Sequence, residues 1–161
     1  MPTVKLRQAS EKDLKGIMTV ENDCFGSERY DSRTVRAFLR RRDSFVIVAV
    51  EGGQVLGAAM CLFSSGLGEG RIASIAVLRN HRRQGIGSRL LDECEHVLGA
   101  LSLQRYVLEV DTRNRSAVRL YRDRGYVTTG RIDDFYSRGR HAFVMEKTVV
   151  SPPRRVRLRP S

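Results

Sequence analysis

The sequence predicts a mixed α/β domain in which helices cover both faces of a central sheet. Short apolar runs typical of strands alternate with amphipathic stretches typical of helices, which favours a layered sheet. The length of 161 residues, 41% of them hydrophobic, is enough to bury one core without division into two. We therefore expect residues 1–150 to form a single domain. Residues 151–161, rich in proline and arginine, are expected to form a basic, disordered tail.

The N-terminal part is predicted to contain one strand and two helices. Residues 4–9 alternate in polarity as a strand does, and Ser10 with Asp13 forms a capping pair that opens a helix through residue 25. A second helix is predicted over residues 31–42. It ends in three arginines, whose charge favours the negative end of the helix dipole.

A β-hairpin is the clearest local prediction. Residues 45–50 and 55–63 are rich in β-branched and other apolar side chains, and Glu51-Gly52-Gly53-Gln54 between them has the residue types of a tight turn. A loop rich in glycine and serine follows. Residues 71–77 are then expected to form another strand.

The second half alternates helices and strands. The predicted helices cover residues 85–98, with one apolar stripe, and residues 114–124. The predicted strands cover residues 106–110, 126–130 and 142–147. This alternation supports a mixed sheet with helices on both faces.

Composition and charge exclude several classes of protein. No apolar stretch reaches the roughly 18 residues that cross a bilayer, so we expect a cytoplasmic protein without membrane contact. The three cysteines form no CxxC pair, which predicts reduced, mostly buried thiols and no metal site. A formal net charge of +11 favours anionic partners: a polyphosphate cofactor, nucleic acid, a ribosome or an acidic peptide. Charge alone does not choose among them.

The segment between the strand at 71–77 and the next helix has the most specific chemistry. It reads Arg82-Arg83-Gln84-Gly85-Ile86-Gly87-Ser88. The first N–H groups of a helix have no partner inside it, and they favour negative charge, so this segment is suited to bind phosphate. The two glycines let the backbone approach a ligand closely. The segment has neither the GxGxxG of a dinucleotide site nor the Gly-Lys-Ser/Thr ending of a P-loop.

This segment resembles the [R/Q]xxGx[G/A] pyrophosphate loop of the GNAT superfamily of N-acetyltransferases, and Ile75-Ala76-Val77 resembles the strand beside the coenzyme's pantetheine arm. The likeness continues through Leu108-Glu109-Val110, residues 114–121 and Gly125-Tyr126, and is strongest to the ribosomal-protein-alanine acetyltransferases. It implies a GNAT-like fold: a central, mixed, mostly antiparallel twisted sheet of roughly six to seven strands with about four helices.

The resemblance also implies the cofactor, acetyl-CoA, and the residues that bind it. The implied coenzyme contacts are Ile75, Ala76, Val77, Arg82, Arg83, Gln84, Gly85, Ile86, Gly87, Ser88 and Asn114. By the same likeness Glu109 is the general base and Tyr121 the general acid of a direct attack by an amine. A carboxylate can accept the amine's proton, directly or through water, and a phenol can protonate the departing thiolate. The alternatives are a solvated Glu109 and a Tyr121 that packs in the core.

The family likeness places the acceptor between residues 25–31 and the loop at residues 132–140. The aromatic side chains expected to line a peptide groove there are Phe25, Tyr30, Phe135 and Tyr136. Glu28, Asp133 or Asp134 would attract the acceptor's ammonium; ordinary loop packing is the alternative. An α-amino group, with a pKa of about 7.7 to 8.0, needs less help to deprotonate than lysine near ~10.4. This difference favours an N-terminal target.

The predicted function is acetyl transfer to a protein or peptide amine, most simply an N-terminal α-amino group, with ribosomal proteins among the acceptors that the resemblance implies. A small-molecule amine acetyltransferase stays open, because the same cofactor half would serve it. A non-catalytic basic module that binds nucleic acid or a ribosome is the third reading. No recognition helix, zinc finger or RNA-stacking signature supports it, so nucleic acid is expected to bind only through a non-specific basic surface.

Overall fold

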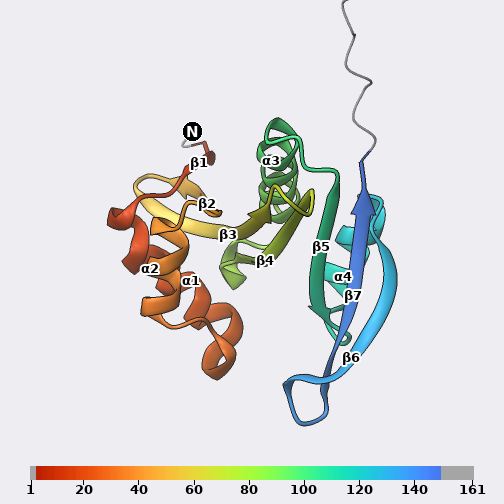
Figure 1. Cartoon of the computed structure of the whole chain (residues 1–161). Helices are drawn as coiled ribbons and strands as arrows, with labels where there is room; N and C mark the ends of the chain where they lie inside the picture. Colours follow the sequence, from red (N-terminus) through yellow and green to blue (C-terminus); the bar gives the residue numbers. More distant parts are fainter. Residues whose placement is uncertain (1–2, 150–161) are drawn as a thin grey trace, which may run out of the picture.

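The computed structural model describes residues 3–149, whose seven strands form one sheet with helices on both faces (Figure 1). The strands are β1 (Lys5–Gln8), β2 (Ser44–Glu51), β3 (Gln54–Ser64), β4 (Glu69–Val77), β5 (Arg105–Asp111), β6 (Val127–Ser137) and β7 (Arg140–Thr148). The helices are α1 (Leu14–Phe25), α2 (Ser32–Arg40), α3 (Ile86–Ala100) and α4 (Arg115–Asp123). Short 3₁₀ turns are η1 (Glu11–Asp13), η2 (Gly26–Glu28) and η3 (Arg79–His81).

The strands are ordered β1-β2-β3-β4-β5-β7-β6 across the sheet. Every neighbouring pair is antiparallel except β4 and β5, which run parallel. The predicted fold class, a mixed and mostly antiparallel sheet flanked by helices, is confirmed.

Local sequence signals account for several of these elements. The carboxylate of Asp31 accepts a hydrogen bond from the N–H of Thr34 at 2.8 Å and so caps α2. Gly52 and Gly53 have φ of 56° and 78°, the left-handed values of a two-residue hairpin turn between β2 and β3. The carboxylate of Asp13 accepts from the N–H of Ser10 at 2.8 Å, but η1 precedes α1, so the predicted helix begins with a tighter turn.

The sheet separates two apolar cores. On β2, Val46 and Val48 point to one face while Phe45 and Ile47 point to the other, as alternation along a strand requires. The first face packs against α1 and α2, and the second against α3 and α4. Both faces are buried, which explains why β2 and β3 are almost continuously apolar.

A β-bulge interrupts β4. Pairing with β3 passes from Ile72 to Ser74 without a partner for Ala73, which is therefore an extra residue in the strand. Ile72 and Ile75 both pack in the core beneath α3. Arg71 and Ser74, although three residues apart, consequently both lie on the opposite face, which α1 and α2 cover. We call it the acceptor face, because residues 25–31, where the acceptor is expected, connect these two helices.

β4 and β5 are joined over a short stretch only. Residues 69–72 pair in parallel with residues 105–108, and no further pairing of these strands occurs among residues 3–149. Beyond Ile72 and Leu108 the strands part. Figure 1 accordingly shows β1 to β4 with α1 to α3 as one group, and β5, β7 and β6 with α4 as another.

The hairpin of β6 and β7 differs from the prediction. We expected a strand over 126–130 and a loop over 132–140, but β6 continues to Ser137 and turns at Gly139, whose φ is 81°. The register shifts between Ile132 and Ser137, and Asp134, at φ 54°, lies within this irregular stretch. Both aspartates lie in the unpaired bulge, and β6 pairs again with β7 at Ser137 opposite Arg140, so a strand with a bulge replaces the loop predicted over 132–140.

Three further predictions concern the cysteines, the membrane and the tail. Cys61 and Cys94 are buried free thiols and Cys24 is a partly buried one, as expected. No helix within residues 3–149 has the length and apolar character to span a bilayer. The predicted tail at residues 151–161 lies outside the described residues.

Candidate active site

The loop before α3 is shaped to bind an anion. Arg83 and Gly85 adopt left-handed φ values of 63° and 78°. A Cβ built at Gly85 would meet no atom within 4 Å, so the glycine is required by its backbone angle rather than by crowding. Residues of alternating handedness turn successive N–H groups toward one point, and the first N–H groups of α3, from Ile86 to Ser88, have no partner within the helix. This loop therefore fits a diphosphate.

Arg82 lies against the end of β4. Its Nε donates a hydrogen bond to the carbonyl of Val77 at 3.1 Å, and its Nη2 lies 3.4 Å from the Sγ of Cys24. The Cys24 thiol donates to the same carbonyl at 3.2 Å. These contacts hold together the end of β4, helix α1 and the loop from Arg82 to Ser88, which we call the anion loop.

The part of β4 that contains Ile75, Ala76 and Val77 has one free edge. Its other edge pairs with residues 57–59 of β3. On the free edge β5 has already parted from β4, so backbone N–H and C=O groups there have no strand partner among the described residues. Backbone groups of this kind need hydrogen bonds, and an extended chain carrying amides supplies them. The residues present therefore fit a pantetheine arm.

Glu109 stands at the point where the two strands part. It directly follows Leu108, the last residue of β5 that pairs with β4. Leu108 and Val110 both pack in the α3 core, so Glu109 points to the acceptor face. Its side chain is 15% exposed and forms an ion pair with Arg71 of β4. The solvated Glu109 of the alternative reading is therefore wrong, because the carboxylate is largely enclosed.

A second carboxylate, Glu21 of α1, also lies on the acceptor face. It is 2% exposed, accepts a hydrogen bond from the Ser74 hydroxyl at 3.1 Å, and accepts one from the N–H of Tyr30 at 3.3 Å. Burial raises its pKa. Our sequence reading missed this residue. The available signal was its place on the apolar stripe of α1, four residues after Ile17.

Tyr30 and Tyr136 lie close to these carboxylates. Burial raises the pKa of Tyr30, and the charges of Glu21 and Glu109 add to the rise while Arg71 opposes it. Burial likewise raises the pKa of Tyr136, with Asp111 and Glu109 adding to it. Two of the four aromatic residues predicted to line the acceptor groove are therefore within electrostatic range of Glu109.

The other two aromatics are more peripheral. Phe25 is 38% exposed at the end of α1, and Phe135 is 45% exposed on β6. The ring of Phe135 packs edge-on against Tyr136, with 4.9 Å between the ring centroids. Both leave apolar surface uncovered next to the site.

Arg140 bridges the two segments that border the acceptor side. Its Nη1 contacts Glu28 of η2 at 2.7 Å, and its Nη2 contacts Asp111 at the end of β5 at 2.5 Å. The Ser137 hydroxyl donates to Glu28 at 3.0 Å. Burial alone would raise the pKa of Asp111, but hydrogen bonds from the Arg113 N–H and from Arg140 outweigh it and lower that pKa.

The three carboxylates predicted to attract the acceptor's ammonium are engaged elsewhere. Glu28 belongs to the Arg140 bridge. Asp133 pairs with Arg131 at 2.9 Å, and Asp134 accepts a hydrogen bond from the N–H of Gly139 at 2.7 Å. Glu109, by contrast, lies on the acceptor face at the point where β4 and β5 part.

Tyr121 projects from α4 into the core. It is 7% exposed, and its ring packs edge-on against Tyr126 with 5.8 Å between centroids. Burial raises its pKa strongly, with smaller effects from Cys94 and Tyr136. Tyr136 thus lies within electrostatic reach of both Tyr121 and Glu109. The core-packing reading of Tyr121 is confirmed, and it is compatible with a role for the hydroxyl.

Asn114 caps α4. Its side-chain oxygen accepts a hydrogen bond from the N–H of Ala117 at 3.2 Å. Only the amide N–H₂ of this side chain is therefore left for the predicted coenzyme contact.

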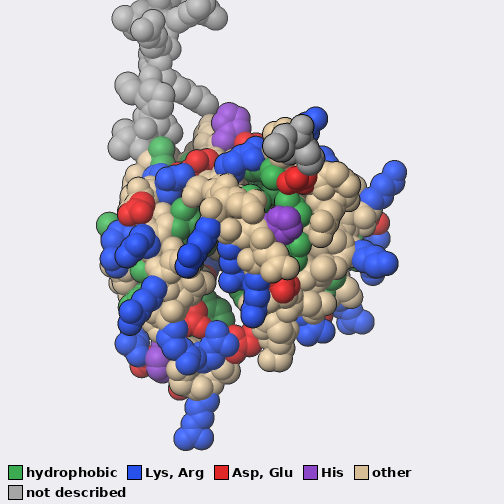
Figure 2. Space-filling view, turned by 180° about the vertical axis from the view of Figure 1, so that it is seen from behind, with side chains coloured by type: hydrophobic (Ala, Val, Ile, Leu, Met, Phe, Trp, Pro, Cys, Tyr) green, Lys and Arg blue, Asp and Glu red, His purple; other side chains and the backbone are tan. Residues whose placement is uncertain are grey.

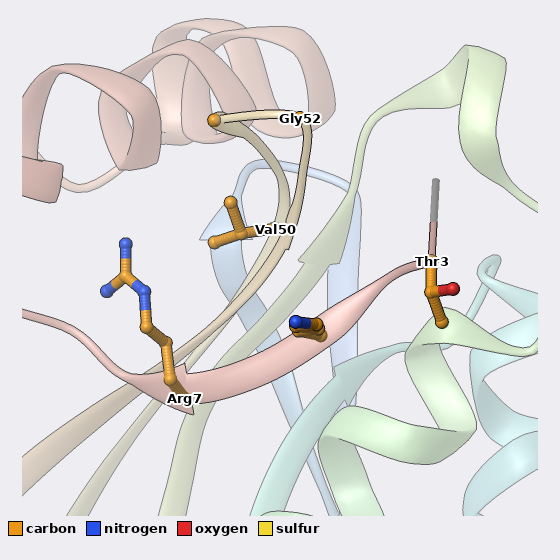
Figure 3. Close-up of a pocket in the computed structure, with 6 residues that line it drawn as sticks. Thr3, Arg7, Val50 and Gly52 are labelled. Carbon is orange, nitrogen blue, oxygen red and sulfur yellow. The ribbon is translucent and has the colours of Figure 1, made fainter. Parts of the chain in front are cut away.

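An open hollow lies elsewhere, at the β1 edge of the sheet. It has a volume of about 370 Å³ and lies between β1 and the β2–β3 turn, with Thr3, Arg7, Val50 and Gly52 around it (Figure 3). Arg7 is already bound by Asp13 at 2.8 Å. Because β1 and β5 are separated by three strands, this hollow has no part in the candidate site.

Comparison with protein families decides the assignment. The model of the acetyltransferase (GNAT) family matches residues 14–126. The chain belongs to this family. GNAT acetyltransferases use acetyl-CoA, so the predicted family and acetyl donor are confirmed.

Sequence relatives of this GNAT chain include N-α-acetyltransferases. It is 30% identical over 138 residues to N-alpha-acetyltransferase 30 of Xenopus laevis, which covers 83% of this chain and 50% of that protein. It is 32% identical over 143 residues to an uncharacterized N-acetyltransferase of Methanocaldococcus jannaschii, which covers 88% and 90%. The chain spans half or less of the length of the vertebrate relatives that it matches.

Solved structures establish the same fold. The ribosomal-protein-S18-alanine N-acetyltransferase from Escherichia coli has a TM-score of 0.85 at 18% identity, over 97% of this chain and 100% of that one. Ard1 from Thermoplasma volcanium has a TM-score of 0.83 at 27% identity, over 92% and 99%. Arabidopsis thaliana NAA60 in complex with acetyl-CoA has a TM-score of 0.80 at 19% identity, over 91% and 99%.

Proposed function

We propose that this GNAT chain transfers the acetyl group of acetyl-CoA to the N-terminal α-amino group of a protein or peptide. The position of Glu109 carries the proposal. Its carboxylate lies where β4 and β5 part and faces the side on which Glu21, Tyr30 and Tyr136 gather. The names of several relatives as N-α-acetyltransferases support the same acceptor class.

The acceptor reacts as a neutral amine, so an ammonium first releases one proton to solvent. The amine then loses a second proton as the amide forms, and the sulfur gains one. The amine nitrogen bonds to the acetyl carbon while the carbon–sulfur bond breaks. Glu109 takes the amine's proton, directly or through one water, because a carboxylate that faces the acceptor is a suitable base. The unpaired N–H groups on the free edge of β4 stabilise the negative charge that develops on the carbonyl oxygen.

Tyr121 supplies the proton that the thiolate takes up, and solvent then restores the phenol. Its raised pKa keeps the hydroxyl protonated throughout the neutral range, which preserves a donor but a weak one. We therefore expect Tyr121→Phe to lower kcat only about tenfold, with the ring packing retained. A kcat equal to that of the wild type would show that this hydroxyl is not the donor.

The geometry around Arg140 favours a chain end as the acceptor. This arginine joins η2 to the β6–β7 hairpin through Glu28 and to β5 through Asp111. We expect these bridged segments to leave less room for a chain that continues on both sides of an internal lysine than for a chain that begins at its acceptor amine. The lower pKa of an α-amino group, about 7.7 to 8.0, points the same way.

A panel of acceptors tests the proposal. The full chain is mixed with acetyl-CoA and one of three sets: N-terminal peptides, including that of a ribosomal protein; the same peptides blocked at the N-terminus with one internal lysine; and polyamines with free amino acids. Thiol release is measured. We expect kcat/KM for N-terminal peptides to exceed the other sets at least about tenfold.

Two other results would contradict the proposal and identify a different function. Preference for polyamines or amino acids would make the chain a small-molecule acetyltransferase. Saturable binding of acetyl-CoA without transfer to any amine would leave a non-catalytic module with this fold.

A further inference from the structure

Arg71 is a charged side chain on the acceptor face to which the proposed reaction assigns no task. It lies opposite Val107 of β5, within the last paired stretch of β4 and β5. Its side chain is 40% exposed, whereas that of its ion-pair partner Glu109 is 15% exposed. A positive charge therefore stands, open to the solvent, beside the carboxylate that receives the acceptor's amine.

Arg71 uses only part of its hydrogen-bonding capacity. A guanidinium carries five N–H donors in a planar fork. Among the described residues, only Nη1 of Arg71 meets an acceptor, which is one oxygen of Glu109. Arg140, in contrast, places all three of its nitrogens on Glu28 and Asp111. Nε and Nη2 of Arg71 thus keep donors for a further ligand, and a carboxylate matches such a fork because it accepts two parallel bonds.

The charge balance of this pair favours an acceptor with a negative group. An ammonium that approaches Glu109 is repelled by Arg71 and competes with it for the same carboxylate. A peptide end that also carries a carboxylate removes this conflict. Its ammonium pairs with Glu109 while its carboxylate pairs with Arg71.

The charge of the whole protein acts in the same direction. The formal net charge is +11, and Figure 2 shows Lys and Arg side chains spread over one face of the molecule. A field of this sign raises the rate at which anionic peptides reach the surface.

We propose that Arg71 selects acceptor peptides that have an acidic side chain at the first or second residue. This inference rests on the proposed N-terminal acetylation and names its substrate class. Consecutive Cα atoms are about 3.8 Å apart, so a carboxylate on either residue can reach a guanidinium that touches the base.

Matched peptides test the selection. Peptides that differ only at the second residue, as Glu, Gln or Lys, are compared, together with pairs that carry Asp or Asn at the first residue. For the wild type we expect kcat/KM to be about tenfold higher for each acid than for its amide, and lowest for Lys. Arg71→Met should bring the acid-to-amide ratio close to one, and Arg71→Lys, which keeps the charge but loses the fork, should retain part of it.

Arg105→Met is the matched control, because Arg105 lies on β5, is 49% exposed and is also ion-paired with a carboxylate, that of Glu146. Its acid-to-amide ratio should equal that of the wild type. A ratio measured on one enzyme preparation is insensitive to a general loss of activity, and so it separates recognition from any effect of Arg71 on Glu109.

Three outcomes would overturn the inference. Equal kcat/KM for acids and amides in an active wild type would do so and leave the proposed function standing. An acid preference that survives in both Arg71→Met and Arg71→Lys would assign the recognition to another group. Absence of transfer to every peptide would reject the proposed function together with this selection.

Discussion

At the scale of single residues, the candidate site keeps two carboxylates in different surroundings. Arg71 forms an ion pair with Glu109, whereas Glu21 is buried with two hydrogen bonds and has a raised pKa. Carboxylates held in different environments can take different roles in one reaction. The first two predictions separate these roles.

Glu109→Gln should lower kcat about 100-fold or more, because the amine then has no base at the point where the strands part. The dissociation constant of acetyl-CoA should change by less than about twofold, since the anion loop is untouched. Steady-state kinetics and calorimetry measure the two quantities. Glu146→Gln is the matched control, as Glu146 is also ion-paired with an arginine. If Glu109→Gln keeps its turnover across the pH range while Glu21→Gln loses it, the base is Glu21.

Glu21→Gln should stabilise the fold at neutral pH. Burial raises the pKa of Glu21 in the folded state above its unfolded value of about 4.3. At pH values between the two pKa values, the native state therefore binds more protons than the unfolded state. Stability is therefore lost as the pH rises through that window, and glutamine removes the loss. We expect a rise in Tm of about 3 °C at pH 7 and little change at pH 4. Equal Tm differences at the two pH values would show that the carboxylate does not titrate as described.

At the scale of elements, the β6–β7 hairpin is held against η2 and β5 by one arginine. Arg140→Met should release the hairpin and raise KM for the peptide acceptor about five- to tenfold, with a smaller effect on kcat and none on acetyl-CoA binding. Hydrogen exchange should increase at residues 132–140. Arg131→Met is the control, because within residues 3–149 Arg131 pairs only with Asp133 of its own strand. Unchanged exchange and KM in Arg140→Met would mean that the bridge does not order the acceptor side.

The elements also show which parts of the fold the sequence can predict. The β2–β3 hairpin and the start of α2 depend on adjacent residues, and they were predicted correctly. The continuation of β6 to Ser137 depends on pairing with β7, which no local preference reveals.

The site was predictable to the extent that a family motif covers it. Glu109 and the loop from Arg82 to Ser88 were predicted as site residues by resemblance, and the structure adds where their neighbours lie. Glu21 accepts a hydrogen bond from Ser74, which lies 53 residues further along the sequence. Arg71 pairs with Glu109, which lies 38 residues further along. Contacts at such separations arise from the topology of the sheet and the bulge in β4. The sequence alone therefore identified Arg71 only as the first residue of a predicted strand.

At the scale of the whole molecule, strand pairing between the two groups of strands is limited, within residues 3–149, to residues 69–72 with residues 105–108. A coenzyme that bonds to the free edge of β4 and to the anion loop should stabilise the folded state. At 100 times its dissociation constant, acetyl-CoA should stabilise the protein by about 2.7 kcal/mol and raise Tm by about 5 to 10 °C. Differential scanning fluorimetry with and without acetyl-CoA measures this shift.

A pair of glycine variants makes the prediction specific. Gly85 and Gly139 both have positive φ, 78° and 81°, with open space around the Cβ position. Alanine at either site should lower the intrinsic Tm by a similar amount, because the backbone strain is the same. Only Gly85→Ala should reduce the shift caused by acetyl-CoA. Equal shifts in the two variants would place the coenzyme away from this loop.

The extra residue in β4 makes this strand tolerant of one change in its length. With Ala73 in place, the strand gives Ile72 and Ile75 to one core and presents Arg71 and Ser74 together on the other face. Without Ala73, the members of each pair would be two residues apart and would keep their shared face by strict alternation. A one-codon deletion at this position would therefore remove the bulge and leave both faces as they are, whereas a second deletion within the strand would turn one half of it over and expose apolar residues.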